Sequence, residues 1–373
     1  MYKCDKRIVM TLDAGGTNFV FSAVQGNREI VTSICLPAAT DNLNLCFQSL
    51  VSGFERVKRQ LLHEPVAISF AFPGPADYEH GIIGDLPNFP AFRGGVALGK
   101  YLEKAFGIPV YINNDGNLFA YGEALAGVLP DLNHKLKEAG NERQFRNLIG
   151  ITLGTGFGAG VVINRNLLTG DNGCGGDLWN FRNLHHPDMI AEESVSIRAV
   201  RRVYMELSED MDTTLTPKDI CDIADGRKVG DSKAARESFR RLGYALGDAI
   251  ASALTLIDGV VVIGGGLSGA SVHILPAVME KLNERFTTFS GNSFDRLQMK
   301  VLDIDNEDQL NELLTLDVDK VPVYGTKEYV SYVRTKKTGI AISKLGTNNA
   351  VCLGAYAFAL NELDKDICCP TLD

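Results

Sequence analysis

Two glycine-rich turns of the same design constrain the fold of this chain more than any other feature. The first covers residues 13–17 (Asp-Ala-Gly-Gly-Thr), and the second covers residues 153–158 (Leu-Gly-Thr-Gly-Phe-Gly). Each turn separates two apolar runs, a pattern typical of two strands joined as a β-hairpin. Glycine leaves room for a phosphate beside the backbone N–H groups of such a turn. A single turn of this kind is common in ordinary hairpins, but two at matching places predict a duplicated fold that holds one nucleotide from both sides.

Composition excludes several classes of protein. With 373 residues, 45% of them hydrophobic, the chain can bury two sizeable cores. Its formal net charge of -9 disfavours nucleic acid and acidic membrane surfaces as partners. No apolar stretch reaches transmembrane length, and the N-terminus lacks the apolar core of a signal peptide. The eight cysteines follow no framework spacing, so we expect reduced thiols and a cytoplasmic protein.

Strand-like and helix-like segments alternate in the manner of an α/β fold. The expected strands are 7–12, 19–24, 66–72, 110–112, 148–153, 159–163 and 260–263, and the expected helices are 95–107, 118–127, 232–257 and 350–360. Residues 131–147 are polar and helix-prone, which predicts an insertion on the surface. The predicted domains are 1–124 together with a returning helix at 350–365, and 125–349.

Five motifs carry a family resemblance through their order and spacing. They are residues 13–17, 72–75 (Phe-Pro-Gly-Pro), 113–115 (Asn-Asn-Asp) with 122–123 (Gly-Glu), 153–156, and 262–266 (Val-Ile-Gly-Gly-Gly). Together they resemble the ROK family (repressors, unclassified open reading frames and sugar kinases) of the actin-like ATPase and hexokinase superfamily. The resemblance implies two actin-like (RNase H-like) α/β ATPase domains with a cleft between them. Residues from about 303 to 349 exceed what this family usually places there, and the sequence assigns them no function.

Transfer of phosphate from ATP needs a phosphate cradle, a carboxylate associated with the metal, and a base aligned with the attacking hydroxyl. Asp13 follows a strand directly and is placed to hold Mg²⁺ through water; an aspartate that bonds only its own turn is the alternative. Residues 264–266 resemble the family's adenosine-side turn, although alone they fit a glycine C-cap or a strand-to-helix turn equally well. The predicted nucleotide-binding residues are Asp13, Gly15, Gly16, Thr17, Gly154, Thr155, Gly156, Gly158, Gly264, Gly265 and Gly266.

Asp115 is the predicted catalytic base and a predicted substrate contact. A carboxylate just ahead of a helix is kept ionised by the helix dipole, and it can orient a sugar hydroxyl and accept its proton. The alternative is that Asp115 only caps the helix. The resemblance implies that Asn114 bonds sugar hydroxyls and that Asn88 lies where the family often has another polar sugar contact, although a loop asparagine is otherwise ordinary turn chemistry.

The region after the second glycine turn departs from the family pattern. ROK kinases usually carry Gly-Glu-x-Gly-His there, and this chain has Asp177 at the acidic position and Asn180 at the histidine position. Glu192 resembles the family's last sugar-contacting glutamate, with Glu193 as the other possible register. The resemblance therefore implies substrate contacts from Asp177, Asn180 and Glu192.

The cysteine-rich zinc loop of the family is also missing, because residues 181–191 contain no cysteine. Cys174, His185 and His186 lack ordinary zinc spacing, so we expect no structural zinc. Apolar packing would then have to hold this sugar loop, with Trp179, Phe181 and Leu184 as the candidate anchors. Trp179 could instead stack on a sugar ring, but a core position is the expectation.

The predicted function is an ATP- and Mg²⁺-dependent sugar kinase that phosphorylates a hexose or an N-acetylhexosamine, on its primary hydroxyl. The expected partners are a small-molecule sugar and, in a homodimer, a second copy of the chain. The alternative is a sugar-sensing regulator or pseudokinase that binds sugar without phosphate transfer. ROK repressors carry an N-terminal helix-turn-helix domain, and here the first phosphate motif already begins at Asp13.

Overall fold

The computed structural model describes residues 2–15, 17–84, 89–208 and 212–368. Of residues 366–368 it describes the backbone only. The chain forms two compact units. The first unit holds Met1–Gly127, Gly160–Gly176 and Lys344–Asp373, and the second holds Val128–Ala159 and Asp177–Ser343. No helix among the described residues is long and apolar enough to cross a membrane.

The first unit is built on a sheet with the strand order β3-β2-β1-β5-β8, and β4 also pairs with β2. The first glycine turn joins the antiparallel strands β1 and β2, while β1, β5 and β8 run parallel to one another. The expected first hairpin is therefore confirmed. The strands are β1 (Val9–Ala14), β2 (Asn18–Gln25), β3 (Arg28–Glu29), β4 (Ile34–Pro37), β5 (Ala67–Ala71) and β8 (Val110–Asn113), with a small separate ribbon of β6 (Ala76–Asp77) and β7 (Ile82–Ile83).

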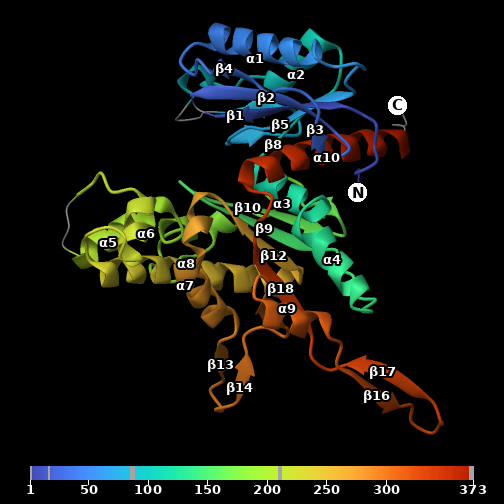
Figure 1. The fold of residues 1–373 in the computed structure, drawn as a ribbon, viewed down its shortest axis with the longest axis vertical. Helices are drawn as coiled ribbons and strands as arrows, with labels where there is room; N and C mark the ends of the chain where they lie inside the picture. The colour runs from blue at the N-terminus through green and yellow to red at the C-terminus, as the bar shows by residue number, and fades with distance from the viewer. Residues whose placement is uncertain (1, 16, 85–88, 209–211, 369–373) are drawn as a thin grey trace. The chain divides into compact units, whose positions relative to one another are not determined.

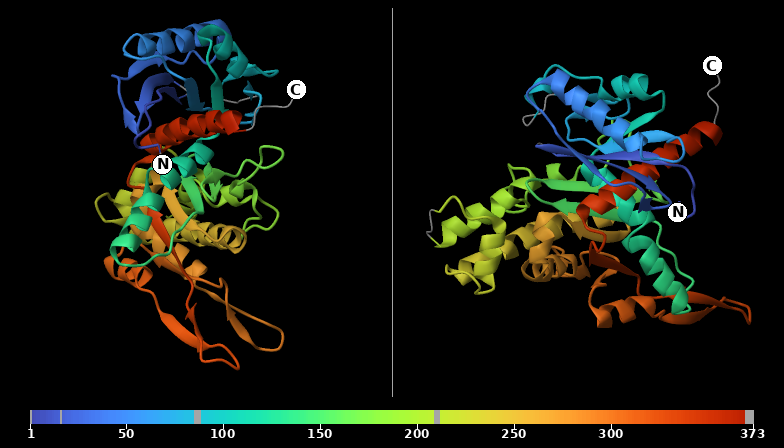
Figure 2. Two further views of the ribbon diagram at one scale, coloured as in Figure 1. Left: turned by 90° about the vertical axis from the view of Figure 1, so that its right-hand side faces the viewer. Right: turned by 45° about the horizontal axis from the view of Figure 1, so that its top comes forward.

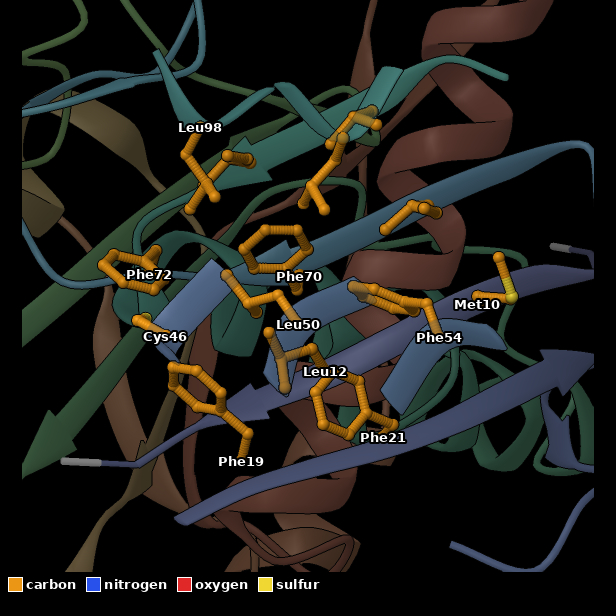
Figure 3. Close-up of a cluster of buried hydrophobic side chains, with 14 of the residues drawn as sticks. Met10, Leu12, Phe19, Phe21, Cys46, Leu50, Phe54, Phe70, Phe72 and Leu98 are labelled. Carbon is orange, nitrogen blue, oxygen red and sulfur yellow. The ribbon is translucent and has the colours of Figure 1, made fainter. Parts of the chain in front are cut away.

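Helices cover both faces of this sheet, as Figure 1 shows for α1 and α10. The helices of the first unit are α1 (Leu43–Lys58), the 3-10 turn η1 (Pro90–Phe92), α2 (Leu98–Phe106), α3 (Asp115–Leu125) and α10 (Thr347–Cys368). Side chains alternate along β1, so Met10 and Leu12 belong to the core on the α1 side while Val9 belongs to the core on the α10 side. The α1 side is rich in aromatic residues (Figure 3), where the Phe21 and Phe54 rings meet edge to face with centroids 5.0 Å apart.

The second sheet has the strand order β11-β10-β9-β12-β18-β15. Strand β12 runs parallel to both of its neighbours, β9 and β18, and β18 runs parallel to β15. The second glycine turn lies between the neighbouring strands β9 and β10, as expected. The strands are β9 (Leu148–Leu153), β10 (Phe157–Ile163), β11 (Asn166–Leu167), β12 (Val260–Gly264), β15 (Lys300–Asp303) and β18 (Lys337–Ile342).

The remaining elements of the second unit are helices and two exposed hairpins. The helices are α4 (Val128–Glu138), α5 (Ile197–Ser208), α6 (Pro217–Ala224), α7 (Ser232–Ile257), α8 (Ser271–Leu282) and α9 (Glu307–Leu314), with the 3-10 turns η2 (Leu178–Asn180), η3 (Ala191–Glu193) and η4 (Gly266–Ala270). The hairpins are β13 (Arg285–Thr287) with β14 (Ser293–Asp295), and β16 (Val318–Pro322) with β17 (Tyr329–Val333).

The expected α/β alternation is confirmed, and one helix boundary needs correction. The helix expected at 118–127 begins earlier, at Asp115, because Asn114 caps it. Residues 131–147 include most of the helix α4, which begins at Val128; most of them are exposed or half-buried, while Leu132, Leu136 and Phe145 are buried. The segment from about 303 to 349, to which the sequence assigned no function, supplies α9, the hairpin of β16 and β17, and the sheet strand β18.

A pair of facing glycines fixes the contact between α3 and α10. A Cβ atom at Gly122 would overlap the carbonyl oxygen of Ala350, and one at Gly354 would overlap the carbonyl oxygen of Leu118. Each glycine thus lets the backbone of one helix reach the backbone of the other. Since α10 also contacts β1, β5 and β8, this crossing ties α3 to the first sheet.

We predict that Gly354→Ala lowers the free energy of unfolding by roughly 3 kcal/mol or more, because the added methyl group forces two helix backbones apart. Urea denaturation of the purified protein measures this. Gly269→Ala is the matched control, since nothing lies near a Cβ atom at that glycine, and its change should stay within about 0.5 kcal/mol. Equal stability of the two variants would contradict the proposed role of the crossing.

Candidate functional site

Three consecutive polar residues shape the step from β8 into α3. Asn113 ends β8, and its buried side-chain oxygen accepts hydrogen bonds from the Asn114 N–H at 2.8 Å and from Asn117 Nδ2 at 2.9 Å. Asn114 is the N-cap of α3, and its side-chain oxygen accepts the N–H of Gly116 at 2.8 Å. Asp115 therefore stands in the first turn of the helix at a fixed place rather than serving as the cap itself.

The Asp115 carboxylate has one engaged oxygen and one that remains available. Its Oδ1 accepts the N–H of Gly116 at 2.8 Å, and no described residue bonds Oδ2. The residue keeps access to solvent, but its carboxyl group lies among enough protein atoms for desolvation to raise the pKa of Asp115, while the N–H of Gly116 lowers it in part. The Nδ2 of Asn114 likewise has no partner among the described residues, so a hydroxyl-bearing ligand could meet a donor and an acceptor side by side.

A glycine on β10 lets this strand reach the start of α3. A Cβ atom at Gly160 would lie 2.5 Å from the carbonyl oxygen of Gly116 and 2.7 Å from the Cα of Asn117. Any larger residue at Gly160 would push the first turn of α3, which carries Asp115, away from the strand. Gly160 was not predicted as a site residue, although its position inside the run that follows the second glycine turn was visible in the sequence.

The first glycine turn places Asp13 at the end of β1. Asp13 pairs with Val20 on β2 and with Ala71 on β5. A Cβ atom at Gly15 would lie 2.8 Å from the carbonyl oxygen of Asn18, so this tight turn requires glycine there. Thr17 is exposed, which leaves its hydroxyl accessible. The predicted contacts Gly16 and Asn88 lie outside the described residues.

The Asp13 carboxylate is exposed and has a single weak partner in the described part of the chain. Asn348, in the first turn of α10, donates to Asp13 Oδ2 over 3.4 Å. No cationic side chain among the described residues pairs with Asp13, and desolvation raises the pKa of this carboxyl group. A carboxylate without a cationic neighbour is well suited to a bound cation.

The glycines of the second turn serve different purposes. The Gly154 N–H donates to the carbonyl oxygen of Gly156 at 3.0 Å, which closes the turn. A Cβ atom at Gly158 would overlap the Thr152 hydroxyl, and one at Gly156 would lie 2.6 Å from Glu192 Oε2. Nothing lies within 4 Å of a Cβ atom at Gly154. Gly156 and Gly158 therefore allow internal packing, while Gly154 leaves open space in front of the turn.

Glu192 lies against this second turn. Its Oε2 accepts the N–H of Phe157 at 2.9 Å, and its Oε1 pairs with Arg198 Nη2 at 3.1 Å. Arg198 also donates through Nη1 to the carbonyl oxygen of Thr155 at 3.3 Å. Both oxygens of Glu192 are thus engaged within the second unit. Arg198 was missed in the sequence, because only the folded turn brings it beside Thr155.

The third glycine turn adjoins the second one. Strand β12 is parallel to β9 with Gly264 opposite Thr152, so both strands end at the same edge of the sheet. Gly265 has φ +90, and a Cβ atom there would overlap the backbone of Leu153. Nothing lies near a Cβ atom at Gly266, so this turn also presents open backbone. The predicted nucleotide-binding residues of the second unit therefore gather at one sheet edge.

The predicted sugar contacts Asp177 and Asn180 lie at the two ends of the turn η2, Asp177 as the residue before it and Asn180 as its last residue. Both side chains are exposed and unpartnered within the described residues, and the Asn180 N–H donates to the carbonyl oxygen of Asp177 at 3.2 Å. Trp179, between them, is 37% exposed. The prediction that Trp179 is a core anchor is wrong, because η2 turns Leu178 rather than Trp179 inward.

A buried asparagine bonds both ends of the segment 183–194, which belongs to the proposed sugar loop. Asn183 is 1% exposed, and its Oδ1 accepts the N–H groups of His185 at 2.9 Å and His186 at 3.1 Å. Its Nδ2 donates to the carbonyl oxygen of Ile190 at 3.0 Å and to the Ser194 hydroxyl at 2.9 Å. One side chain thus joins both ends of residues 183–194, the segment that includes Glu192. Hydrogen bonds to a single amide help to organise this loop, while Phe181 and Leu184, the other two candidate anchors, are half-buried.

The described residues contain one group of possible metal ligands, and it is not in the sugar loop. Cys221, Asp225 and His273 lie together between α6 and α8. His273 Nε2 lies 2.7 Å from Asp225 Oδ1, and Arg227 pairs with Asp225 Oδ2 at 2.7 Å. The Asp225 carboxylate is thus already paired with protein groups. The expectation that the chain holds no structural zinc stays a prediction.

Comparisons with known proteins agree on one family. The model of the ROK family matches residues 9–303. A solved glucokinase from Parabacteroides distasonis is 56% identical, with 97% of this chain and 99% of that chain covered and a TM-score of 0.87. Glucokinase of Thermotoga maritima is 28% identical over 73% of this chain and 86% of its own length. N-acetyl-D-glucosamine kinase of Vibrio vulnificus is 27% identical over 69% of this chain and 83% of its own length.

We predict that Asn183→Ala loosens the sugar loop and lowers the free energy of unfolding by about 3 kcal/mol, because several buried polar groups lose their partner together. Amide hydrogen exchange should accelerate at His185 and His186. Asn172→Ala, at an exposed loop position, is the control and should leave both measurements unchanged. Unaltered exchange at His185 and His186 in the Asn183 variant would show that another contact holds the loop.

Proposed function

Since this chain belongs to the ROK family and is a sugar kinase with two actin-like α/β domains, we propose that it transfers the γ-phosphate of ATP to the primary hydroxyl of a hexose. The observation that carries this proposal is the Asp115 carboxylate at the start of α3, with Oδ2 unbonded by any described residue and the amide of Asn114 beside it. Glucose is the first substrate to test, because the glucokinase that is 56% identical covers almost the whole chain.

Asp115 is proposed as the base. Its Oδ2 would accept a hydrogen bond from the attacking hydroxyl and then take the proton as the bond to phosphorus forms. The raised pKa of this carboxyl group makes it a stronger proton acceptor than an ordinary aspartate. The N–H of Gly116 and the helix dipole still favour the ionised form that the step requires. Asn114 Nδ2 would donate to a neighbouring sugar oxygen and so fix the direction of the attacking hydroxyl.

The glycine turns are proposed to hold ATP. Gly15, Gly16 and Thr17 would bind phosphate oxygens, as would Gly154, Thr155, Gly156 and Gly158, and Gly264, Gly265 and Gly266 would lie on the adenosine side. The exposed Asp13 carboxylate without a cationic partner in the described residues fits Mg²⁺. Asp13 would hold this ion through water, and the ion would supply neutralisation of the phosphate charge.

Asp177, Asn180 and Glu192 are proposed as further sugar contacts, together with Asn88. The free side chains of Asp177 and Asn180 can bond hydroxyls directly. Glu192 already accepts from Phe157 and Arg198, so a sugar hydroxyl would share an oxygen with one of them. An N-acetylhexosamine is the second substrate class, because the relative from Vibrio vulnificus is an N-acetyl-D-glucosamine kinase.

The alternative function is a sugar-sensing regulator or pseudokinase. The state of the Asp115 carboxylate favours a kinase over this alternative. A pseudokinase needs no free proton acceptor beside the sugar, whereas Asp115 keeps one oxygen unbonded by the described residues and has a raised pKa. Release of ADP from ATP in the presence of glucose, mannose, fructose, allose and the N-acetylhexosamines separates the two functions. Binding of sugar without ADP release from any of them would favour the pseudokinase.

We predict that Asp115→Asn lowers kcat about 10³-fold and leaves the dissociation constant of the sugar within a few-fold of wild type, because the amide keeps the size but cannot take the proton. Because desolvation raises the pKa of Asp115, kcat/KM of the wild type should fall with decreasing pH through a pKa above the ordinary value of about 3.9. The exposed Asp41→Asn is the control for charge removal and should keep full activity. Turnover by the Asp115 variant close to wild type would exclude this residue as the base.

We also predict that Gly154→Val raises KM for ATP roughly tenfold while sugar binding stays unchanged. The open space at this glycine accepts a side chain without disturbing the fold, so the effect arises only where the phosphate must approach the backbone. Gly154→Ala should give a smaller change in the same direction. If ATP affinity is the same in all three proteins, the second turn does not bind phosphate.

A further inference from the structure

One exposed hairpin of the second unit has no role in the proposed chemistry. Residues 316–334, called the arm below, hold β16 and β17 and lie between α9 and β18. They fall outside the part of the chain that the family model matches, which ends at residue 303. Every residue of both strands is exposed. Figures 1 and 2 show the arm extending away from the second sheet.

The arm is apolar on both of its faces. On one face Val318 lies opposite Val333, and on the other Val321 lies opposite Val330. Its large hydrophobic side chains are exposed to the following extents: Leu316 40%, Val318 46%, Val321 48%, Tyr324 102%, Tyr329 64%, Val330 59%, Tyr332 50% and Val333 38%. A two-stranded ribbon with water on both faces is marginally stable. This concentration of exposed apolar side chains, although Asp319, Lys320 and Ser331 lie among them, is typical of an interaction site.

The neighbouring hairpin has the same character. Phe286 on β13 lies opposite Phe294 on β14, and the two are 52% and 56% exposed. Phe289, in the connecting turn, is fully exposed. In the chain this hairpin lies between α8 and β15, and the arm lies between α9 and β18, so both segments of the second unit present exposed aromatic side chains.

We propose that the arm is an interface through which the chain binds a second copy of itself. Charge favours this partner. The arm carries three basic residues (Lys320, Lys327, Arg334) and three acidic ones (Asp317, Asp319, Glu328), so its formal charge is zero, whereas the whole chain carries -9. Arg334 pairs with Asp319 at 2.8 Å within the arm. Two copies therefore meet here without the repulsion that their acidic surfaces create elsewhere.

The ribbon geometry suits self-association as well. In a two-stranded sheet each strand has one edge whose N–H and C=O groups are not paired with the other strand, and such an edge can pair with a second chain. A two-fold arrangement places the same apolar face against itself, so Val321, Val330 and Tyr332 of both copies would become buried together. An acidic membrane surface is a poorer occupant, because it repels a chain with this net charge.

Sedimentation velocity over a range of concentrations tests the proposal with the full chain. Wild type should be dimeric at about 10 μM, and Val330→Ser with Tyr332→Ser, on one face of the arm, should raise the dissociation constant about 100-fold. Tyr329→Ser with Val333→Ser tests the opposite face. The control is Leu62→Ser with Val229→Ser, which removes two apolar side chains that are 94% and 98% exposed elsewhere and should leave the dissociation constant within twofold.

A melting temperature and a sugar kinase activity close to those of wild type show that a variant is folded. Activity serves only as this control, and the dissociation constant of the dimer decides whether the arm is the interface. A wild-type protein that stays monomeric at about 100 μM overturns it, as does a dimer that is unchanged by both arm variants. Binding of the monomer to phosphatidylcholine vesicles, lost in the arm variants, would overturn it in favour of a membrane.

Discussion

The crossing of α3 and α10 is the contact on which the first half of the candidate site depends. Gly122 and Gly354 bring two helix backbones together, and α10 in turn packs under the first sheet through Leu353 and Tyr356. Asp115 stands at one end of α3, and Asn348 at the start of α10 reaches Asp13. The proposed base is thus carried by one of these helices, and the proposed metal-associated carboxylate, which stands on β1, is contacted by the other. A shift of either helix would move groups that must stay aligned for phosphate transfer.

The glycines that carried the sequence argument do not form one functional class. Gly15, Gly156, Gly158 and Gly265 are needed because a Cβ atom would strike protein atoms, whereas Gly154 and Gly266 face open space. At Gly154 and Gly266 no atom of the described residues requires a glycine, so close approach of a ligand to the backbone is the remaining reason for a glycine there. A motif therefore records two requirements at once, a tight turn and an accessible backbone, and only the structure separates them.

Local features could be predicted from the sequence, and features that depend on distant contacts could not. The two hairpins at the glycine turns (β1 with β2, and β9 with β10) and the helices α2 and α7 could be predicted from the alternation and spacing of apolar residues. Asp115 was predicted as a site residue from its neighbours in the motif. Asn183 was missed because its importance comes from its burial and from partners up to 11 residues away. Trp179 was misplaced because hydrophobicity alone does not show that a 3-10 turn presents the side chain to solvent. Arg198 needed the fold of the second turn before its contact with Thr155 existed.

Glu192 links two parts of the second unit that the sequence suggested would serve different substrates. Its carboxylate bonds the backbone of the turn expected to hold phosphate, and Glu192 itself lies in the segment 183–194 whose two ends Asn183 joins. Any ligand that competes for a Glu192 oxygen must weaken the bond to Phe157 or the pair with Arg198, which also bonds Thr155. If the proposed roles hold, a sugar bound at Glu192 would therefore alter the turn proposed to bind phosphate, and by linkage the reverse holds equally. In a kinase such coupling would favour closing the phosphate turn around ATP only when the sugar loop is occupied, which limits transfer of phosphate to water.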